Sequence, residues 1–125
     1  MYFKKQGSEN TSQTLELAVA AARRERIGHV VVASNSGKTA LPLLDAGLSV
    51  VCVTHAYGYP EKGKNEMPDE VRERLQAAGV RVLTTSHVLS GVERGISNRS
   101  KGMYPAEIIA NALRMFGQGT KVCVE

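Results

Sequence analysis

The sequence predicts a three-layer α/β domain, in which helices cover both faces of a mostly parallel, doubly wound sheet. Short, nearly continuous apolar runs of β-branched residues recur, which is typical of strands buried on both faces of a parallel sheet. Segments with apolar residues at helical spacing alternate with these runs and indicate right-handed βαβ units. At 125 residues, 42% of them hydrophobic, the chain is expected to form one domain over residues 1–125.

The first half of the chain predicts two helices and two strands. Glycine follows each helical segment and Pro42 is expected in the first turn or so of the second helix, where proline is tolerated. The expected elements are a helix from Asn10 or Thr11 to about Arg26, a strand at His29–Ser34, a helix at Gly37–Ala46 and a strand at Leu48–Thr54.

The second half begins with a long loop, His55–Met67, which leaves the carboxyl end of the second strand. Ser86–Gly102 lacks clean periodicity and predicts a short helix at best, followed by a loop. The other expected elements are a helix from Pro68 to Gly79, a strand at Val80–Thr85, a helix from Pro105 to about Phe116 and a strand at Lys121–Glu125.

The turn after the first strand, SNSGKT at Ser34–Thr39, is the leading candidate for an anion-binding site. Ligands of open parallel sheets bind beyond the carboxyl ends of the strands, where helix N-termini present backbone N–H groups. The residues Ser34, Asn35, Ser36, Gly37, Lys38 and Thr39 supply polar groups, a flexible glycine and a cation, which suit phosphate. The alternative is that a serine only caps the helix. A P-loop is excluded because Val32 stands where its first glycine is required.

Four segments of the chain resemble a family of small stand-alone proteins, mostly archaeal and bacterial, related to the pyruvate kinase C-terminal α/β domain. These segments are VVASNSGKTA, VVCVTHAYGYPEKGKNEM, SHVLSGVERGISNR and YPAEIIANALRMFGQGTKVCVE. The resemblance implies a regulatory rather than catalytic domain, without pyruvate kinase activity, and a phosphate held at the SNSGKT turn. It also implies flavin mononucleotide (FMN), a nucleotide or a sugar phosphate as ligand.

Family members usually continue into a further helix and strand, so the resemblance implies that this chain is truncated. A terminal strand without its covering helix would leave apolar surface exposed. We therefore expect either reduced stability or a homo-oligomer that hides this surface.

The histidines His55 and His87 follow the second and third strands and are the best acid–base candidates. No nucleophile or carboxylate partner is evident, which favours the alternative that each is a loop histidine hydrogen-bonded to the backbone. Tyr57 and Tyr59, on either side of Gly58, would stack on a flat ligand or only pack the loop. Thr54 adds a hydroxyl at a strand end.

The segment Ser86–Gly102, called the irregular segment below, carries two guanidinium groups among its glycines and serines. They belong to Arg94 and Arg99. Such a composition would grip a second anionic portion of the ligand, or form a solvated basic loop. Both interpretations stay open.

The net charge of +4 is spread over several segments and suits a small anionic ligand. Nucleic acid is not expected, because aromatic residues are only 5% of the chain and tryptophan is absent. Cys52 and Cys123 lie in apolar runs without metal-ligand spacing, so we expect two buried free thiols and no metal. With no signal-peptide core and no stretch of about 20 apolar residues, a soluble, cytoplasmic protein is expected.

Two functions of different classes follow. The first is a binding or regulatory module for a phosphorylated small molecule. The second is an enzyme on a phosphorylated substrate or a bound flavin, with His55 and His87 as acid–base groups. A third possibility is a remnant that folds only with a partner.

Overall fold

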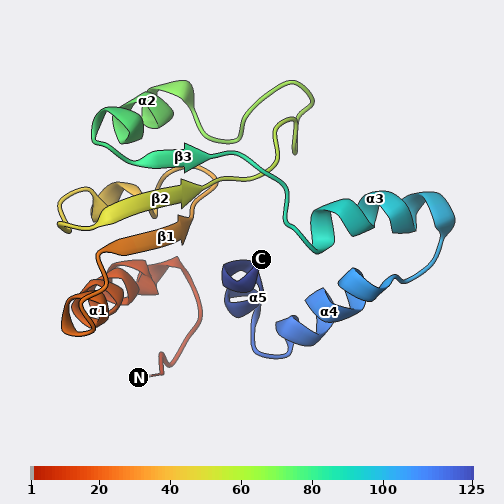
Figure 1. Ribbon diagram of the computed structural model, residues 1–125, viewed down its shortest axis with the longest axis horizontal. Helices are drawn as coiled ribbons and strands as arrows, with labels where there is room; N and C mark the ends of the chain where they lie inside the picture. Colours follow the sequence, from red (N-terminus) through yellow and green to blue (C-terminus); the bar gives the residue numbers. More distant parts are fainter. Residues whose placement is uncertain (1) are drawn as a thin grey trace. The chain divides into compact units, whose positions relative to one another are not determined.

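The computed structural model describes residues 2–125, without the side chains of residues 90, 92 and 93, and shows an α/β chain (Figure 1). It divides into two compact units, each described by itself here: Met1–Thr54 with Met67–Leu83, and His55–Glu66 with Thr84–Glu125. In chain order the elements are η1 (Ser8–Asn10), α1 (Thr11–Arg24), β1 (His29–Ala33), η2 (Leu41–Leu43), β2 (Ser49–Val53), α2 (Asp69–Ala77), β3 (Arg81–Leu83), α3 (Ser90–Ser100), α4 (Pro105–Arg114) and α5 (Gln118–Val124).

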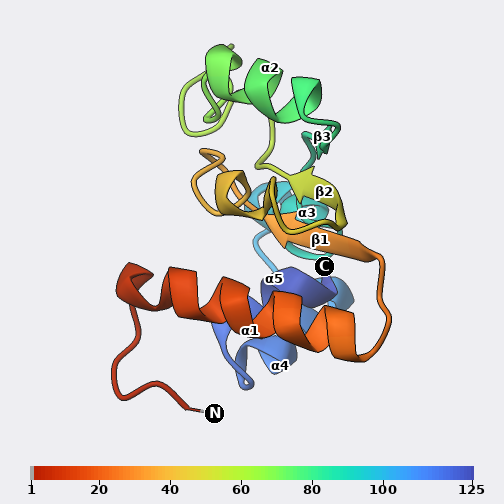
Figure 2. The ribbon, with the colours of Figure 1, turned by 90° about the vertical axis from the view of Figure 1, so that its left-hand side faces the viewer.

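The first unit contains a parallel sheet with the strand order β1-β2-β3. Val30 pairs with Val50, and Cys52 pairs with both Val32 and Val82. The three apolar runs therefore form the strands that their composition predicts, because β-branched side chains pack well on a pleated surface. Figures 1 and 2 show α1 beside β1 and α2 beside β3.

The core of the first unit lies on one face of this sheet. Cys52 and Leu75 are fully buried there, and Leu15 and Val19 of α1 pack against the same cluster. On the opposite face, Val31 is 71% exposed. Right-handed crossovers between strands in the order 1-2-3 place the connecting segments on the same face. Within the first unit alone the helices thus cover one face, and the three-layer arrangement stays a prediction.

The helix expected at Gly37–Ala46 is wrong. Only the short 3-10 helix η2 forms there, within a series of turns closed by i→i+3 bonds such as Ala40 N–H to Gly37 O at 3.0 Å. Gly37 has a φ of +84°, outside the helical region, and Pro42 has no N–H to donate. The Gly37 carbonyl still accepts one i→i+4 bond, from the Leu41 N–H at 3.0 Å, but Pro42 cannot donate the next bond of the series.

The second unit joins the loop of residues 55–66 to the helices α3, α4 and α5. The irregular segment forms an 11-residue helix, longer than expected. The strand expected at Lys121–Glu125 is wrong, because these residues belong to or cap α5, and Glu125 N–H donates to Lys121 O at 3.1 Å. A run rich in valine favours a strand only where a neighbouring strand is there to pair with it.

Both cysteines are free thiols, but only one is buried. Cys52 lies in the core, and burial raises the pKa of its thiol although the nearby Arg72 opposes the shift. Cys123 lies on α5 and is exposed, which corrects the expectation of two buried thiols. No helix within residues 2–125 is long and apolar enough to cross a membrane.

Candidate functional site

The SNSGKT turn is organised mainly by packing and by one internal hydrogen bond. Ser34 is buried, and its Oγ accepts a hydrogen bond from the Thr39 N–H at 3.1 Å. Gly37 lies so close to α2 that an added Cβ would stand 2.4 Å from Val71 Cγ1. Asn35 and Lys38 are exposed. Since no α-helix begins here, the turn lacks the helix N-terminal charge on which the phosphate prediction partly depended.

Thr54, another predicted site residue, is buried at the end of β2. Its N–H donates to Leu83 O at 2.8 Å, so its backbone continues the sheet. The ligand role expected for its hydroxyl stays a prediction.

The second unit brings four predicted candidates together at one cavity of about 370 Å³. They come from the loop, the segment before α3 and α3 itself, and are His55, Tyr59, His87 and Arg94. The complete lining is His55, Ala56, Tyr59, Ser86, His87, Gly91, Arg94, Arg114, Gln118 and Lys121. We take this cavity as the candidate site, because it collects cationic and imidazole groups in one concave place.

A group of three titratable side chains lies at one side of the cavity. His87 Nδ1 stands 2.8 Å from Glu125 Oε2, and Lys121 Nζ stands 3.0 Å from His87 Nδ1 and 2.5 Å from Glu125 Oε2. The side chains of Lys121 and Glu125 are each only 1% exposed. Two charges are therefore held out of water, where each needs the other.

His87 Nδ1 has two neighbours but only one role in each tautomer. With a proton on Nδ1 it donates to the Glu125 carboxylate, and with a lone pair there it accepts from the Lys121 ammonium. Each neutral tautomer of His87 thus has a hydrogen-bond partner at Nδ1.

The pKa of His87 is lowered from its ordinary value of 6.5, first by burial and then by the positive charge of Lys121. Glu125 acts in the opposite direction, while His55 and Arg94 lower the pKa further. His87 is accordingly neutral at physiological pH. A neutral imidazole can accept a proton, whereas a permanent imidazolium cannot.

His55 forms edge-on contacts with two other rings. Its centroid lies 5.8 Å from that of His87 at an interplanar angle of 88°, and 4.6 Å from that of Tyr59 at 61°. The three rings form one aromatic wall of the cavity. Tyr59, which was expected either to stack on a ligand or to pack the loop, is 54% exposed within this wall.

Tyr57 and Gly58 do not line the cavity. The Tyr57 hydroxyl donates to Gly63 O at 2.7 Å, and Gly58 N–H donates to Lys64 O at 2.9 Å. These bonds join the two arms of the loop. For Tyr57 the structure therefore favours the packing role over ligand stacking.

Arg114, Gln118, Lys121 and Glu125 are residues of this region that the sequence did not single out. Arg114 donates to Asn111 Oδ1 at 2.5 Å and to Gln118 Oε1 at 3.2 Å, which uses two of the five N–H groups of a guanidinium. The available signal was the spacing of Gln118, Lys121 and Glu125, which are three and four residues apart and share one side of a helix. Because Lys121–Glu125 was predicted to be a strand, this helical spacing was not considered.

Among the residues that the structure describes, no group of three or more His, Cys, Asp or Glu side chains is arranged to hold a metal ion. The lining of the cavity supplies guanidinium, ammonium and imidazole groups. When the sequence is compared with models of known protein families, none of them matches.

Proposed function

We propose that this protein is a binding or regulatory module for a phosphate-bearing small molecule, and that the cavity of the second unit receives the phosphate. The observation that carries the proposal is the convergence of Arg94, Arg114 and Lys121 with two imidazoles on one cavity. Guanidinium groups match phosphate geometry and form its strongest hydrogen bonds.

Glu125 balances only part of this positive charge. It pairs with Lys121 and contacts His87, whereas the arginines lie elsewhere in the lining. A dianionic phosphate entering the cavity would meet two guanidinium groups and two imidazoles, whose ring N–H groups can donate hydrogen bonds. Phosphate is thus a better fit than a neutral ligand.

The resemblance to the pyruvate kinase C-terminal domain supports the same class of ligand and adds FMN, nucleotides and sugar phosphates as candidates. It also supports a three-layer, doubly wound fold, with the SNSGKT turn as an alternative position for the phosphate. The parallel sheet of the first unit is compatible with such a fold.

We further propose a cytoplasmic location and self-association. The two free thiols favour a reducing compartment. Val31 and Leu83 are 71% and 52% exposed on one face of the sheet, and a second copy of the chain would cover such a face.

The test is a calorimetric titration with inorganic phosphate, a sugar phosphate and FMN at constant ionic strength. Arg94→Gln is expected to lower the affinity for the most tightly bound of these compounds by at least about tenfold, which is the usual effect of losing a charged hydrogen bond. Arg99→Gln is the matched control, since Arg99 is exposed on the same helix and does not line the cavity.

Lys38→Gln separates the two positions for the phosphate. If this variant loses binding while Arg94→Gln retains it, the ligand binds at the SNSGKT turn of the first unit. The absence of saturable binding for all three compounds would overturn the proposal as a whole.

A second candidate function is catalysis on the bound ligand, with His87 and His55 as acid–base groups. It is favoured by the lowered pKa of His87, which keeps the imidazole neutral and able to accept a proton. His87→Ala and His55→Ala should each abolish turnover of a sugar phosphate or FMN while phosphate still binds. Unchanged turnover in both variants would remove this candidate.

A further inference from the structure

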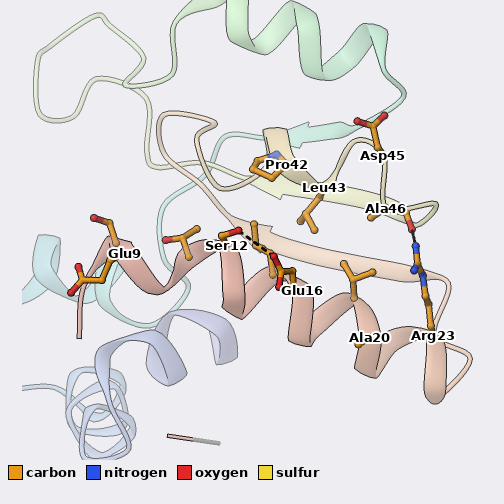
Figure 3. Close-up of a pocket in the computed structure, with 13 residues that line it drawn as sticks. Glu9, Ser12, Glu16, Ala20, Arg23, Pro42, Leu43, Asp45 and Ala46 are labelled. Carbon is orange, nitrogen blue, oxygen red and sulfur yellow. Dashed lines mark hydrogen bonds between the residues drawn. The ribbon is translucent and has the colours of Figure 1, made fainter. Parts of the chain in front are cut away.

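A second concave site lies in the first unit, between α1 and the turns around η2 (Figure 3). Its volume is about 700 Å³, within the range of about 300–1,000 Å³ that is usual for small-molecule sites. The lining consists of Ser8, Glu9, Thr11, Ser12, Leu15, Glu16, Val19, Ala20, Arg23, Pro42, Leu43, Asp45 and Ala46.

The floor of this α1–η2 groove is apolar. Leu43 is 2% exposed and belongs to the core, while Leu15 and Val19 are partly buried against the same core. Pro42 and Ala46 continue the apolar lining on the side of the turns. A ligand with an apolar body would remove this surface from water.

The charged groups of the groove are mainly acidic. Glu9, Glu16 and Asp45 supply three carboxylates against the single guanidinium of Arg23, a formal net charge of −2. The chain as a whole carries +4, so the groove differs in sign from the average surface. Glu16 lies near the middle of α1, where its Oε1 accepts a hydrogen bond from Ser12 Oγ at 3.4 Å.

Arg23 has a structural role at one end of the groove. Its Nη2 donates to the Ala46 carbonyl oxygen at 3.1 Å, and Figure 3 shows the side chain reaching from α1 to the turn. The bond fixes α1 against the segment that carries Asp45. Arg23 keeps its positive charge in this bond, and the three carboxylates outnumber it.

We propose that the α1–η2 groove binds a small molecule with an apolar body and one protonated amine. The apolar floor would receive the body, and Glu16 or Asp45 would pair with the ammonium group. Phosphate-bearing compounds are unsuited to this site, because they would meet carboxylates of the same sign. The site is therefore separate in chemistry from the phosphate cavity of the second unit and does not rest on the proposed function.

The experiment uses three probes of matched shape, 4-phenylbutylamine, 4-phenylbutanol and 4-phenylbutyrate, which differ in charge at their polar end. Each is titrated into the full chain and followed by methyl NMR spectra. The amine is expected to shift the methyl resonances of Leu15 and Val19 and to bind about fivefold more tightly than the alcohol, as for one partly exposed ion pair. The carboxylate is expected to bind most weakly.

Glu16→Gln and Asp45→Asn are the test variants, and Glu73→Gln on the exposed side of α2 is the control. At least one test variant should lower the affinity for the amine towards that for the alcohol, while the control leaves it unchanged. Equal affinity for all three probes, shifts away from α1, or no saturable binding of the amine would each overturn the proposal.

Discussion

Lys121 of α5 and Glu125, which caps that helix, form a buried ion pair one helical turn apart. Lys121 Nζ lies 2.5 Å from Glu125 Oε2, and each side chain is only 1% exposed. Burying two charges is costly unless they compensate each other. Elsewhere in the second unit Lys64 and Glu61 are 2.7 Å apart, but their side chains are 67% and 66% exposed. The two pairs differ in burial rather than in distance, which makes them a natural comparison.

Lys121→Met should destabilise the protein by about 3–5 kcal/mol, because it leaves the Glu125 carboxylate buried without its cation. Lys121→Met with Glu125→Leu should recover most of this loss, since two apolar side chains need no compensation. Lys64→Met is the control, with an expected change below about 1 kcal/mol. Denaturant unfolding measures all of these, and equal effects of the two lysine substitutions would contradict the buried pair.

His87 should make stability depend on pH. Its pKa is lowered in the folded state, mainly by burial, from an ordinary value of 6.5 that applies to the unfolded chain. Below that value His87 binds a proton more readily in the unfolded state than in the folded state. The free energy of unfolding therefore falls as the pH is lowered, and it levels off below the pKa of the folded state. Above it His87 is neutral in both states and adds no pH dependence.

The check is the denaturation midpoint of the wild type and of His87→Gln, measured at about pH 7.5 and about pH 5. The wild type should lose more stability on acidification than the variant. His29→Gln, at an exposed position in β1, should follow the wild type. A wild type and His87→Gln variant with the same acid sensitivity would show that His87 is not the group responsible.

The three strands could be predicted from sequence because their apolar runs are rich in β-branched residues. The same nearly continuous runs predicted burial on both faces, whereas Val31 is 71% exposed on one face of the first unit. The helices α1 and α4 were predicted for the same kind of reason, since their apolar residues recur at helical spacing. Local pattern was sufficient wherever the pattern and the packing agreed.

The segment around η2 and the end of the chain show where local pattern fails. Gly37 and Pro42 each seemed compatible with a helix, but the backbone of Gly37 is left-handed and Pro42 cannot donate the hydrogen bond that would continue a helix. In the predicted strand Lys121 and Glu125 would be about 13 Å apart, whereas α5 brings their side chains into contact. The candidate cavity was therefore predicted in part: His55, Tyr59, His87 and Arg94 were named from the sequence, and the lysine and carboxylate beside them were not.

Gly37 and Gly79 provide the sharpest test of the first unit, because both have a φ of +84° and only their surroundings differ. A Cβ at Gly37 would stand 2.4 Å from Val71 Cγ1, whereas nothing lies within 4 Å of one at Gly79. Gly79→Ala should thus cost about 1–2 kcal/mol for the left-handed backbone alone. Gly37→Ala should cost about 1–3 kcal/mol more, for displacing α2 from the turn. Gly37→Ala with Val71→Ala should recover part of the difference by making room for the new methyl group. Equal unfolding free energies for the two glycine variants would mean that the SNSGKT turn does not pack beneath α2.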